Sequence, residues 1–171
     1  MSEPPGGLLV RRALPEDLEA VGEITVAAYA EFTAGPDDTY IERLRDAARR
    51  DREAELWVAE VDGQVLGTVT IALPGSPWRE IATDGEGEFR MLAVSPAARR
   101  MGIGDALARL ALDRFRDLGY RSIVLSSLDT MAGAHRIYER LGYHRVPERD
   151  WSPQPGVQLI AYEKELSWSP P

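Results

Sequence analysis

The sequence predicts a mixed α/β fold, with a sheet that carries helices on its faces. Two observations favour this class. Short β-rich runs alternate along the chain with longer stretches whose apolar residues recur at helical spacing. The length of 171 residues fits one domain, and the 44% hydrophobic content is enough for a core. We therefore expect a single domain over residues 1–171, with a core of about 8–166 and frayed ends.

The first third of the chain predicts one strand and two helices. Residues 7–14 (GLLVRRAL) are the expected strand. Pro15 suits a first helical turn, and the apolar spacing that follows predicts a helix to about Ala30. Residues 31–37 break this helix, and a second, charged helix is expected through residues 39–51.

A hairpin and a long loop follow. Two β-rich runs over residues 55–73 flank Asp62-Gly63, a strong hairpin signal. Residues 74–87 are a loop rich in Pro and Gly, and loops of this length are usually functional or mobile. Residues 88–94 (EFRMLAV) are mostly apolar, which predicts a central strand.

The last part predicts two helices and two strands. The first helix follows Gly102 and ends at Leu118, with Gly119 as its C-terminal cap. A buried strand is expected over residues 121–128, and a shorter helix ends at Gly142. The final strand is expected at residues 157–166, and the tail 167–171 is expected to fray.

Composition excludes several classes of protein. The formal net charge of -8 argues against binding to nucleic acid or to anionic membranes. With no cysteine and two histidines, neither a disulfide framework nor a metal site is expected. No apolar stretch approaches the ~20 residues of a membrane helix, and the first residues do not resemble a signal peptide. A cytoplasmic protein is therefore expected.

The stretch SPAARRMGIGDAL, residues 95–107, predicts an anion site. It begins a helix, whose first N–H groups are unpaired and carry partial positive charge. Gly102 and Gly104 allow close approach of a ligand to the backbone, and Arg99 and Arg100 add charge. The alternative is a tight turn with solvated arginines. Position 107 is Leu and no Walker lysine is present, so the dinucleotide and nucleoside-triphosphate motifs do not fit.

With Arg99, Gly102 and Gly104 in place, RRMGIG resembles the R/Q-x-x-G-x-G/A pyrophosphate loop of the GCN5-related N-acetyltransferase (GNAT) family. MLAVSPAARR is similar to that family's central strand and turn, and AHRIYERLGYHRV is similar to its late helix. The resemblance spans nearly the whole chain and is most specific from Glu88 to Tyr143. It implies a mostly antiparallel, twisted sheet, splayed at its middle strands and flanked by about four helices.

The resemblance also implies a reaction. Acetyl-CoA is the expected co-substrate, and the expected acceptor is a primary amine of a small molecule or peptide that attacks the thioester directly. O-acetylation, transfer of a longer acyl group and a non-catalytic acyl-CoA-binding module stay open as alternatives. A homodimer through the last strand and residues 150–156 is compatible with the resemblance.

Ten positions are implied as cofactor-binding. Backbone groups of the central strand would pair with the pantetheine arm, and N–H groups of the loop and first helical turn would hold the pyrophosphate. These positions are Leu92, Ala93, Val94, Arg99, Arg100, Met101, Gly102, Ile103, Gly104 and Asp105. Asp105 is an acid within the first turn, so capping of that turn is its alternative role.

Two catalytic residues are implied. Tyr138 matches the general acid that protonates the leaving thiolate, for which a phenol of pKa near 10 is adequate. Glu88 matches a general base, and Glu86, two residues away, is the alternative. One departure stands out: Met131 occupies the position, seven residues before Tyr138, where many relatives have an asparagine that contacts the CoA arm. Ser126, Ser127 or Asp129 are candidates to replace that contact.

The acceptor is expected to lie against residues 28–40, 74–87 and 147–156. These segments contain aromatic and acidic side chains that would suit a cationic amine. The aromatic residues are Tyr29, Phe32, Tyr40, Trp78 and Trp151, and the acids are Glu31, Asp37, Asp84 and Glu86.

Overall fold

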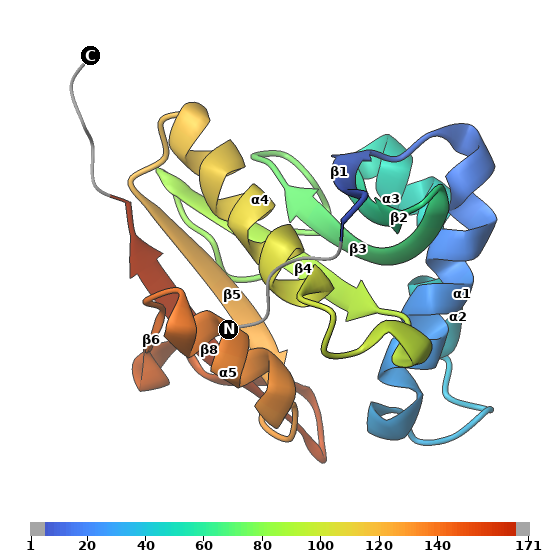
Figure 1. The fold of residues 1–171 in the computed structure, drawn as a ribbon. Helices are drawn as coiled ribbons and strands as arrows, with labels where there is room; N and C mark the ends of the chain where they lie inside the picture. The colour runs from blue at the N-terminus through green and yellow to red at the C-terminus, as the bar shows by residue number, and fades with distance from the viewer. Residues whose placement is uncertain (1–5, 167–171) are drawn as a thin grey trace.

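The computed structural model describes residues 6–166, whose eight strands join in one sheet (Figure 1). The strands are β1 (Leu8–Arg12), β2 (Glu55–Val61), β3 (Gln64–Ala72), β4 (Glu86–Val94), β5 (Ser122–Leu128), β6 (His144–Arg145), β7 (Trp151–Gln154) and β8 (Val157–Glu165). Their order is β1-β2-β3-β4-β5-β8-β6, with β7 also paired to β8. All pairs are antiparallel except β4 with β5. The predicted mixed, mostly antiparallel class is therefore confirmed.

Five α-helices lie within the described residues, one more than the sequence predicts. They are α1 (Leu18–Tyr29), α2 (Tyr40–Arg45), α3 (Ala47–Glu53), α4 (Ile103–Asp117) and α5 (Ala132–Arg140). The extra helix arises because the stretch expected as one helix is divided at Asp46. The carboxylate of Asp46 accepts a hydrogen bond from the N–H of Arg49 and so caps α3.

The strong local signals are confirmed where they were predicted. Asp62 and Gly63 both have positive φ, 51° and 83°, as the tight turn between β2 and β3 requires. Gly119 and Gly142 have positive φ just after α4 and α5. The two-residue β6 and the short β7 were not predicted, because so few residues carry no readable alternation. The expected fraying of residues 167–171 lies outside the described residues.

The two faces of the sheet are covered by different helices. Along β2, Trp57 and Ala59 pack on the side of α4, whereas Leu56 and Val58 pack with Val21 of α1 on the other side. This alternation is the period of two that places successive side chains on opposite faces. Helices α4 and α5 therefore cover one face, and α1 to α3 cover the other (Figure 1).

The sheet opens between its two central parallel strands. Strand β4 pairs with β5 only from Glu86 to Glu88, and its remaining residues have no partner on β5. On the other side, the register of β4 with β3 shifts near Met91, which has a φ of 52°. Such a bulge bends a strand and increases its twist. The splayed centre implied by the resemblance is therefore present.

Candidate active site

A groove of about 880 Å³ lies where β4 leaves β5, beside the first turn of α4. We call it the α4 groove. Nine of the ten positions implied as cofactor-binding line it, and Met101 is the exception. Met101 is instead partly buried against the main apolar core. The structure thus gathers the predicted segment around one open space, while the role of each residue stays a prediction.

The backbone around the first turn of α4 is shaped for close approach of a ligand. Gly102 is the N-terminal cap of this 15-residue helix, with a φ of 77°, and Arg100 has a φ of 67°. The first intrahelical bond runs from the N–H of Ala106 to the carbonyl of Gly102, so the N–H groups before it have no helical partner. Gly104 lets α5 approach, because a Cβ there would lie 2.9 Å from Ile137 Cδ1.

The charges of the α4 groove are partly paired. Arg99 lies 3.2 Å from the carboxylate of Glu31, and Arg140 lies 2.8 Å from that of Asp105. The contact of Arg140 explains how an acid fits in this turn: Asp105 links α4 to α5 and its charge is neutralised. Capping of the turn by Asp105, the alternative prediction, is not found among the hydrogen bonds of the described residues.

Met131 lies at the start of α5, where it lines the α4 groove and also a second cavity. The residues proposed to replace the missing asparagine do not line the groove. Ser126 and Ser127 face the second cavity, and their hydroxyls lie near Trp151 Nε1 (3.0 Å) and His135 Nε2 (3.2 Å). Met131 therefore supplies an apolar wall at this position.

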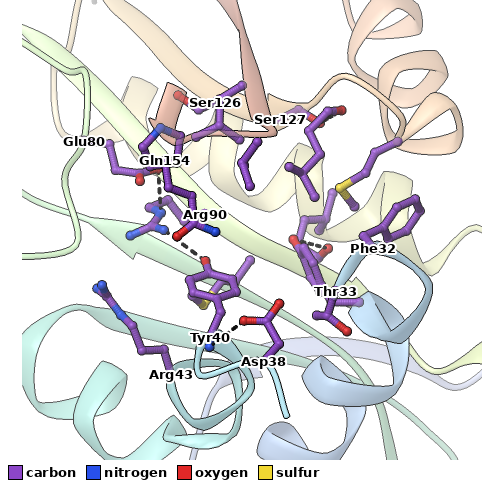
Figure 2. A pocket seen from close by; sticks show the side chains of 18 of the residues that line it. Phe32, Thr33, Asp38, Tyr40, Arg43, Glu80, Arg90, Ser126, Ser127 and Gln154 are labelled. Atoms are coloured by element: carbon purple, nitrogen blue, oxygen red, sulfur yellow. Dashed lines mark hydrogen bonds and ion pairs between the residues drawn. The ribbon is translucent and has the colours of Figure 1, made fainter. Parts of the chain in front are cut away.

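The second cavity, which we call the central cavity, has a volume of about 400 Å³ and lies between the open strands and the segment before α2 (Figure 2). Tyr29, Phe32, Leu92 and Met131 line both spaces, so the central cavity and the α4 groove meet there. At the junction the Tyr29 hydroxyl donates a hydrogen bond of 3.4 Å to the Leu92 carbonyl. All three segments expected to hold the acceptor contribute to the central cavity.

Tyr138 lies on the wall of the central cavity, within a group of aromatic rings. Its ring centroid is 5.7–6.0 Å from those of Phe89, Tyr143 and Tyr162. Burial raises the pKa of Tyr138, so the phenol keeps its proton at neutral pH. Among the described residues none hydrogen-bonds its hydroxyl, which leaves the O–H available to a group in the cavity.

Glu88 and Glu86, the two candidate bases, do not line the central cavity. Glu88 is fully buried, and its Oε1 accepts hydrogen bonds of 2.9–3.1 Å from the N–H groups of residues 80, 81 and 82. Burial acts to raise the pKa of Glu86, but hydrogen bonds from Arg149 and Thr83 lower it to about 2. Both carboxylates hold the loop before β4, and the catalytic role of either stays a prediction.

Glu80, a residue that sequence reasoning missed, is one of two carboxylates that line the central cavity, the other being that of Asp38. The Oε1 of Glu80 lies 2.9 Å from Nε of Arg90, and burial raises the pKa of Glu80 against the opposing charge of that arginine. Arg90 also donates to the Trp78 carbonyl (3.2 Å) and to the Tyr40 hydroxyl (3.3 Å; Figure 2). No local motif marks Glu80, because its place depends on the loop that Glu88 holds.

The expected aromatic and acidic lining is only partly correct. Tyr29, Phe32 and Tyr40 line the central cavity, but Trp78 and Trp151 do not. Trp78 is 1% exposed and packs in the core, where its indole N–H donates to Glu53. The expected acids are also absent from this lining, which contains Asp38 and Glu80 with Arg43 and Arg90. The prediction that the wall is rich in carboxylates, made for a cationic amine, is therefore wrong.

Two further features of the described residues bear on ligands. Between residues 6 and 166, no group of three or more His, Cys, Asp or Glu side chains is arranged to hold a metal ion. Over the same range, no helix combines the length and apolar character needed to cross a membrane.

Comparison with known proteins finds one family. A sequence model described as the acetyltransferase (GNAT) family matches residues 18–143. Among individual relatives, the mycothiol acetyltransferase of Cellulomonas flavigena is 33% identical over 173 aligned positions, which cover 91% of this chain and 48% of that protein. The chain thus spans about half the length of this relative.

Solved structures share the fold. A GCN5-related N-acetyltransferase from Kribbella flavida superposes with a TM-score of 0.66 at 26% identity, covering 94% of this chain and 98% of that one. A putative acetyltransferase from Salmonella typhimurium, solved with acetyl-CoA, superposes with a TM-score of 0.67 at 21% identity over 95% of each chain.

Proposed function

The chain belongs to the GNAT family of acetyltransferases, and on that premise we propose that it transfers an acetyl group from acetyl-CoA to the primary amine of a small molecule. The observation that carries the proposal is the meeting of the α4 groove and the central cavity at Leu92 and Met131, with Tyr138 on the wall beside them. A donor in one space and an acceptor in the other would bring their reacting atoms together at this junction.

The α4 groove suits the donor. Acetyl-CoA supplies the thioester acetyl group, and the chain supplies the groups that hold it. From Leu92 to Val94, β4 pairs with β3 on one side but has no partner strand on the side of β5, so this edge could pair with amides as a neighbouring strand would. The free N–H groups at the first turn of α4 and the side chain of Arg100 suit the pyrophosphate. A backbone N–H near Leu92 would polarise the thioester carbonyl.

Tyr138 is the proposed general acid. Tyr138 lines the cavity, and its raised pKa keeps the phenol protonated at neutral pH, so that it has a proton to donate to the leaving sulfur. The surrounding rings of Phe89, Tyr143 and Tyr162 fix its orientation. In this proposal, the phenol donates its proton to the sulfur as the CoA thiolate leaves.

Glu80 is the proposed group that receives the proton of the amine, directly or through water. It faces the central cavity, and its raised pKa makes it a better proton acceptor than an exposed glutamate. Glu88, the base predicted from the sequence, holds the backbone of residue 80 and so positions Glu80. In this proposal Glu88 positions the loop, and Glu80 accepts the proton from the substrate.

Thermal stability with and without ligand is the first test. Acetyl-CoA or CoA at 100 times its Kd should stabilise the protein by about 2.7 kcal/mol and raise its Tm by several degrees, whereas NAD and ATP should not. Release of CoA thiol is then followed with a panel of amines. The chain has no cysteine, so a thiol reagent reports only CoA. Binding without thiol release for any amine would leave a binding module, and no binding would refute the proposal.

A further inference from the structure

The central cavity carries a positively charged wall. Arg43 of α2 and Arg90 of β4 both line it, and their guanidinium carbons lie 5.0 and 5.7 Å from the ring centroid of the buried Trp78. In Figure 2, Arg43, Arg90 and Glu80 lie on one side of the cavity, and Phe32 and Thr33 lie on the other. The positive charge of the lining is therefore confined to one side.

The two arginines of this wall differ in their partners. Arg90 is fixed by Glu80, the Trp78 carbonyl and the Tyr40 hydroxyl, and its side chain is 10% exposed. Arg43 stacks on Trp78 and pairs with no carboxylate within residues 6–166. Its charge is thus held at the cavity by an aromatic surface and stays available to a ligand.

Glu80 attracts Arg43 but forms its ion pair with Arg90, so the neighbouring charges neutralise Arg43 only in part. Arg50 lies fully buried behind it and donates to the backbone carbonyls of Arg43 and Leu44, which adds positive charge. Asp38 faces the cavity, but its carboxylate accepts hydrogen bonds from the N–H groups of Ala34 and Tyr40 and serves its own loop. With Arg50 counted, three arginines stand against Glu80 and Asp38 here, whereas the whole chain has 28 acidic and 20 basic residues.

We propose, resting on the acetyl transfer proposed above, that the acceptor is an amino acid, with a carboxylate beside its amine, and that Arg43 binds this carboxylate. The planar guanidinium presents paired N–H donors that match the two oxygens of a carboxylate. The same wall assists the reaction. Positive charge near the amine favours its neutral form, which is the form that attacks the thioester.

The size and the opposite wall narrow the class of acceptor. A cavity of about 400 Å³ lies toward the small end of ligand pockets, which are roughly 300–1,000 Å³. Away from the charged wall, the lining combines apolar side chains, among them Phe32, Leu128, Met131 and Leu159, with uncharged polar ones such as Thr33, Ser126, Ser127 and Gln154. The apolar part suits the side chain of a free amino acid, whereas a polyamine would bring further positive charge beside Arg43 and Arg90.

The test compares acceptors that differ only in the carboxylate. Leucine, methionine and phenylalanine are each compared with the matching amino alcohol, which keeps the amine and the side chain but carries no charge in place of the carboxylate. Thiol release gives kcat/KM for each. We expect the amino acid to exceed its alcohol by about 10- to 100-fold, as expected for one hydrogen-bonded charge pair.

Three variants test whether Arg43 causes the preference for amino acids over amino alcohols. Arg43→Ala should remove it by lowering kcat/KM for the amino acids alone, and Arg43→Lys should restore part of it. Arg45→Ala is the matched control, because Arg45 is on the same helix but pairs on the surface with Glu23. The rise in Tm with acetyl-CoA, measured on each variant, shows that it is folded.

Several results would overturn the inference. The first is a kcat/KM of the unchanged protein for the amino alcohols that equals or exceeds its kcat/KM for the amino acids. The second is an equal loss of kcat/KM for both series in Arg43→Ala. The third is no acetylation in either series. Thiol release with simple amines then separates the two proposals. If simple amines react, acetyl transfer stands and only the amino-acid acceptor fails, and if nothing reacts both fail.

Discussion

The Nε atom of Arg90 lies 2.9 Å from Oε1 of Glu80, in a cavity wall that no sequence motif marks. Glu80 reaches this position because its own N–H, with those of Ile81 and Ala82, is held by the buried Oε1 of Glu88. A carboxylate in the core thus fixes the loop that carries a carboxylate at the site. Glu88 therefore holds the loop, and Glu80 is the residue proposed to take part in the chemistry.

Exchange of either glutamate for glutamine should distinguish these roles. Burial raises the pKa of Glu80, and a base works only when deprotonated, so kcat/KM should rise with pH through that raised value. Glu80→Gln should lower kcat/KM by about 100-fold and remove this step from the profile. Glu88→Gln should keep the step and lower stability by about 1–3 kcal/mol, measured by denaturant unfolding. A profile of Glu80→Gln that matches the original protein would contradict the assignment.

Tyr138→Phe should remove a proton donor and leave the packing intact. Phenylalanine keeps the ring contacts with Phe89, Tyr143 and Tyr162, and the described residues provide no hydrogen bond to lose. We expect kcat to fall by about 100-fold or more, with the acetyl-CoA-dependent rise in Tm unchanged. Tyr143→Phe is the control, because Tyr143 does not line the cavity and its buried hydroxyl has no hydrogen-bond partner between residues 6 and 166. Equal losses in both variants would argue for a packing effect.

Gly104→Glu should block the α4 groove. The new side chain would place bulk and negative charge beside the first turn of α4, where a pyrophosphate is proposed to bind. A Cβ there would lie 2.9 Å from Ile137 Cδ1, the flexible end of that side chain, and at an ordinary contact distance of 3.7 Å from Val94 Cγ2, so the fold should survive. Titration calorimetry should show no binding of acetyl-CoA to a variant that still unfolds cooperatively. Retained affinity would refute the pyrophosphate assignment.

Gly22→Ala should disturb the contact between α1 and α2. A Cβ at residue 22 would lie 2.4 Å from the backbone carbonyl oxygen of Arg45, which cannot move without its helix. We expect a loss of about 1–3 kcal/mol in the free energy of unfolding. Because α2 carries Tyr40 and Arg43, KM for the acceptor should rise more than Kd for acetyl-CoA.

Gly133→Ala is the matched control for stability. Residue 133 lies in α5, and a Cβ there would have only the tip of Arg136 within 4 Å, at 3.9 Å. Alanine in an open helical position should leave stability unchanged or raise it by about 0.4–1 kcal/mol. A similar loss in the two variants would show that steric contact with α2 is not the cause.

Glu86 should contribute to stability in a pH-dependent way. Its pKa is lowered to about 2 in the folded protein, since hydrogen bonds from Arg149 and Thr83 outweigh the effect of burial. The contribution is therefore fully present above the unfolded pKa of about 4.3 and is lost as pH falls toward about 2. Glu86→Gln should be less stable by about 2 kcal/mol at pH 7, and the difference should shrink across this acid range. A constant difference from pH 7 to pH 2 would contradict this linkage.

The segment that lines the α4 groove and several turns could be predicted, because each depends on residues that are neighbours in the sequence. The donor segment from Leu92 to Asp105 is contiguous in the chain, and nine of its ten predicted residues line one groove. Asp62-Gly63 and Gly119 determine backbone conformation at their own positions, and both were predicted from neighbours alone. Short strands such as β6 were missed, because two residues become a strand only when β8 lies beside them.

The acceptor side was decided by the tertiary structure. Trp78 could equally have lined a cavity, and it is buried because Glu53 accepts its N–H and Leu44, Ala72 and Met91 enclose its ring. The same packing brings Arg43 and Arg90, 47 residues apart in sequence, to one wall.

By itself, the sequence determined the order of the elements, the turns and the glycine-rich start of α4, because each depends on residues close together in the chain. Only the tertiary structure decided which charges face the central cavity. Glu80 enters the cavity because Glu88 holds its loop, and Arg43 keeps an available charge because it stacks on Trp78 instead of pairing with an acid. Such contacts join distant segments, and their geometry follows from packing of the whole core.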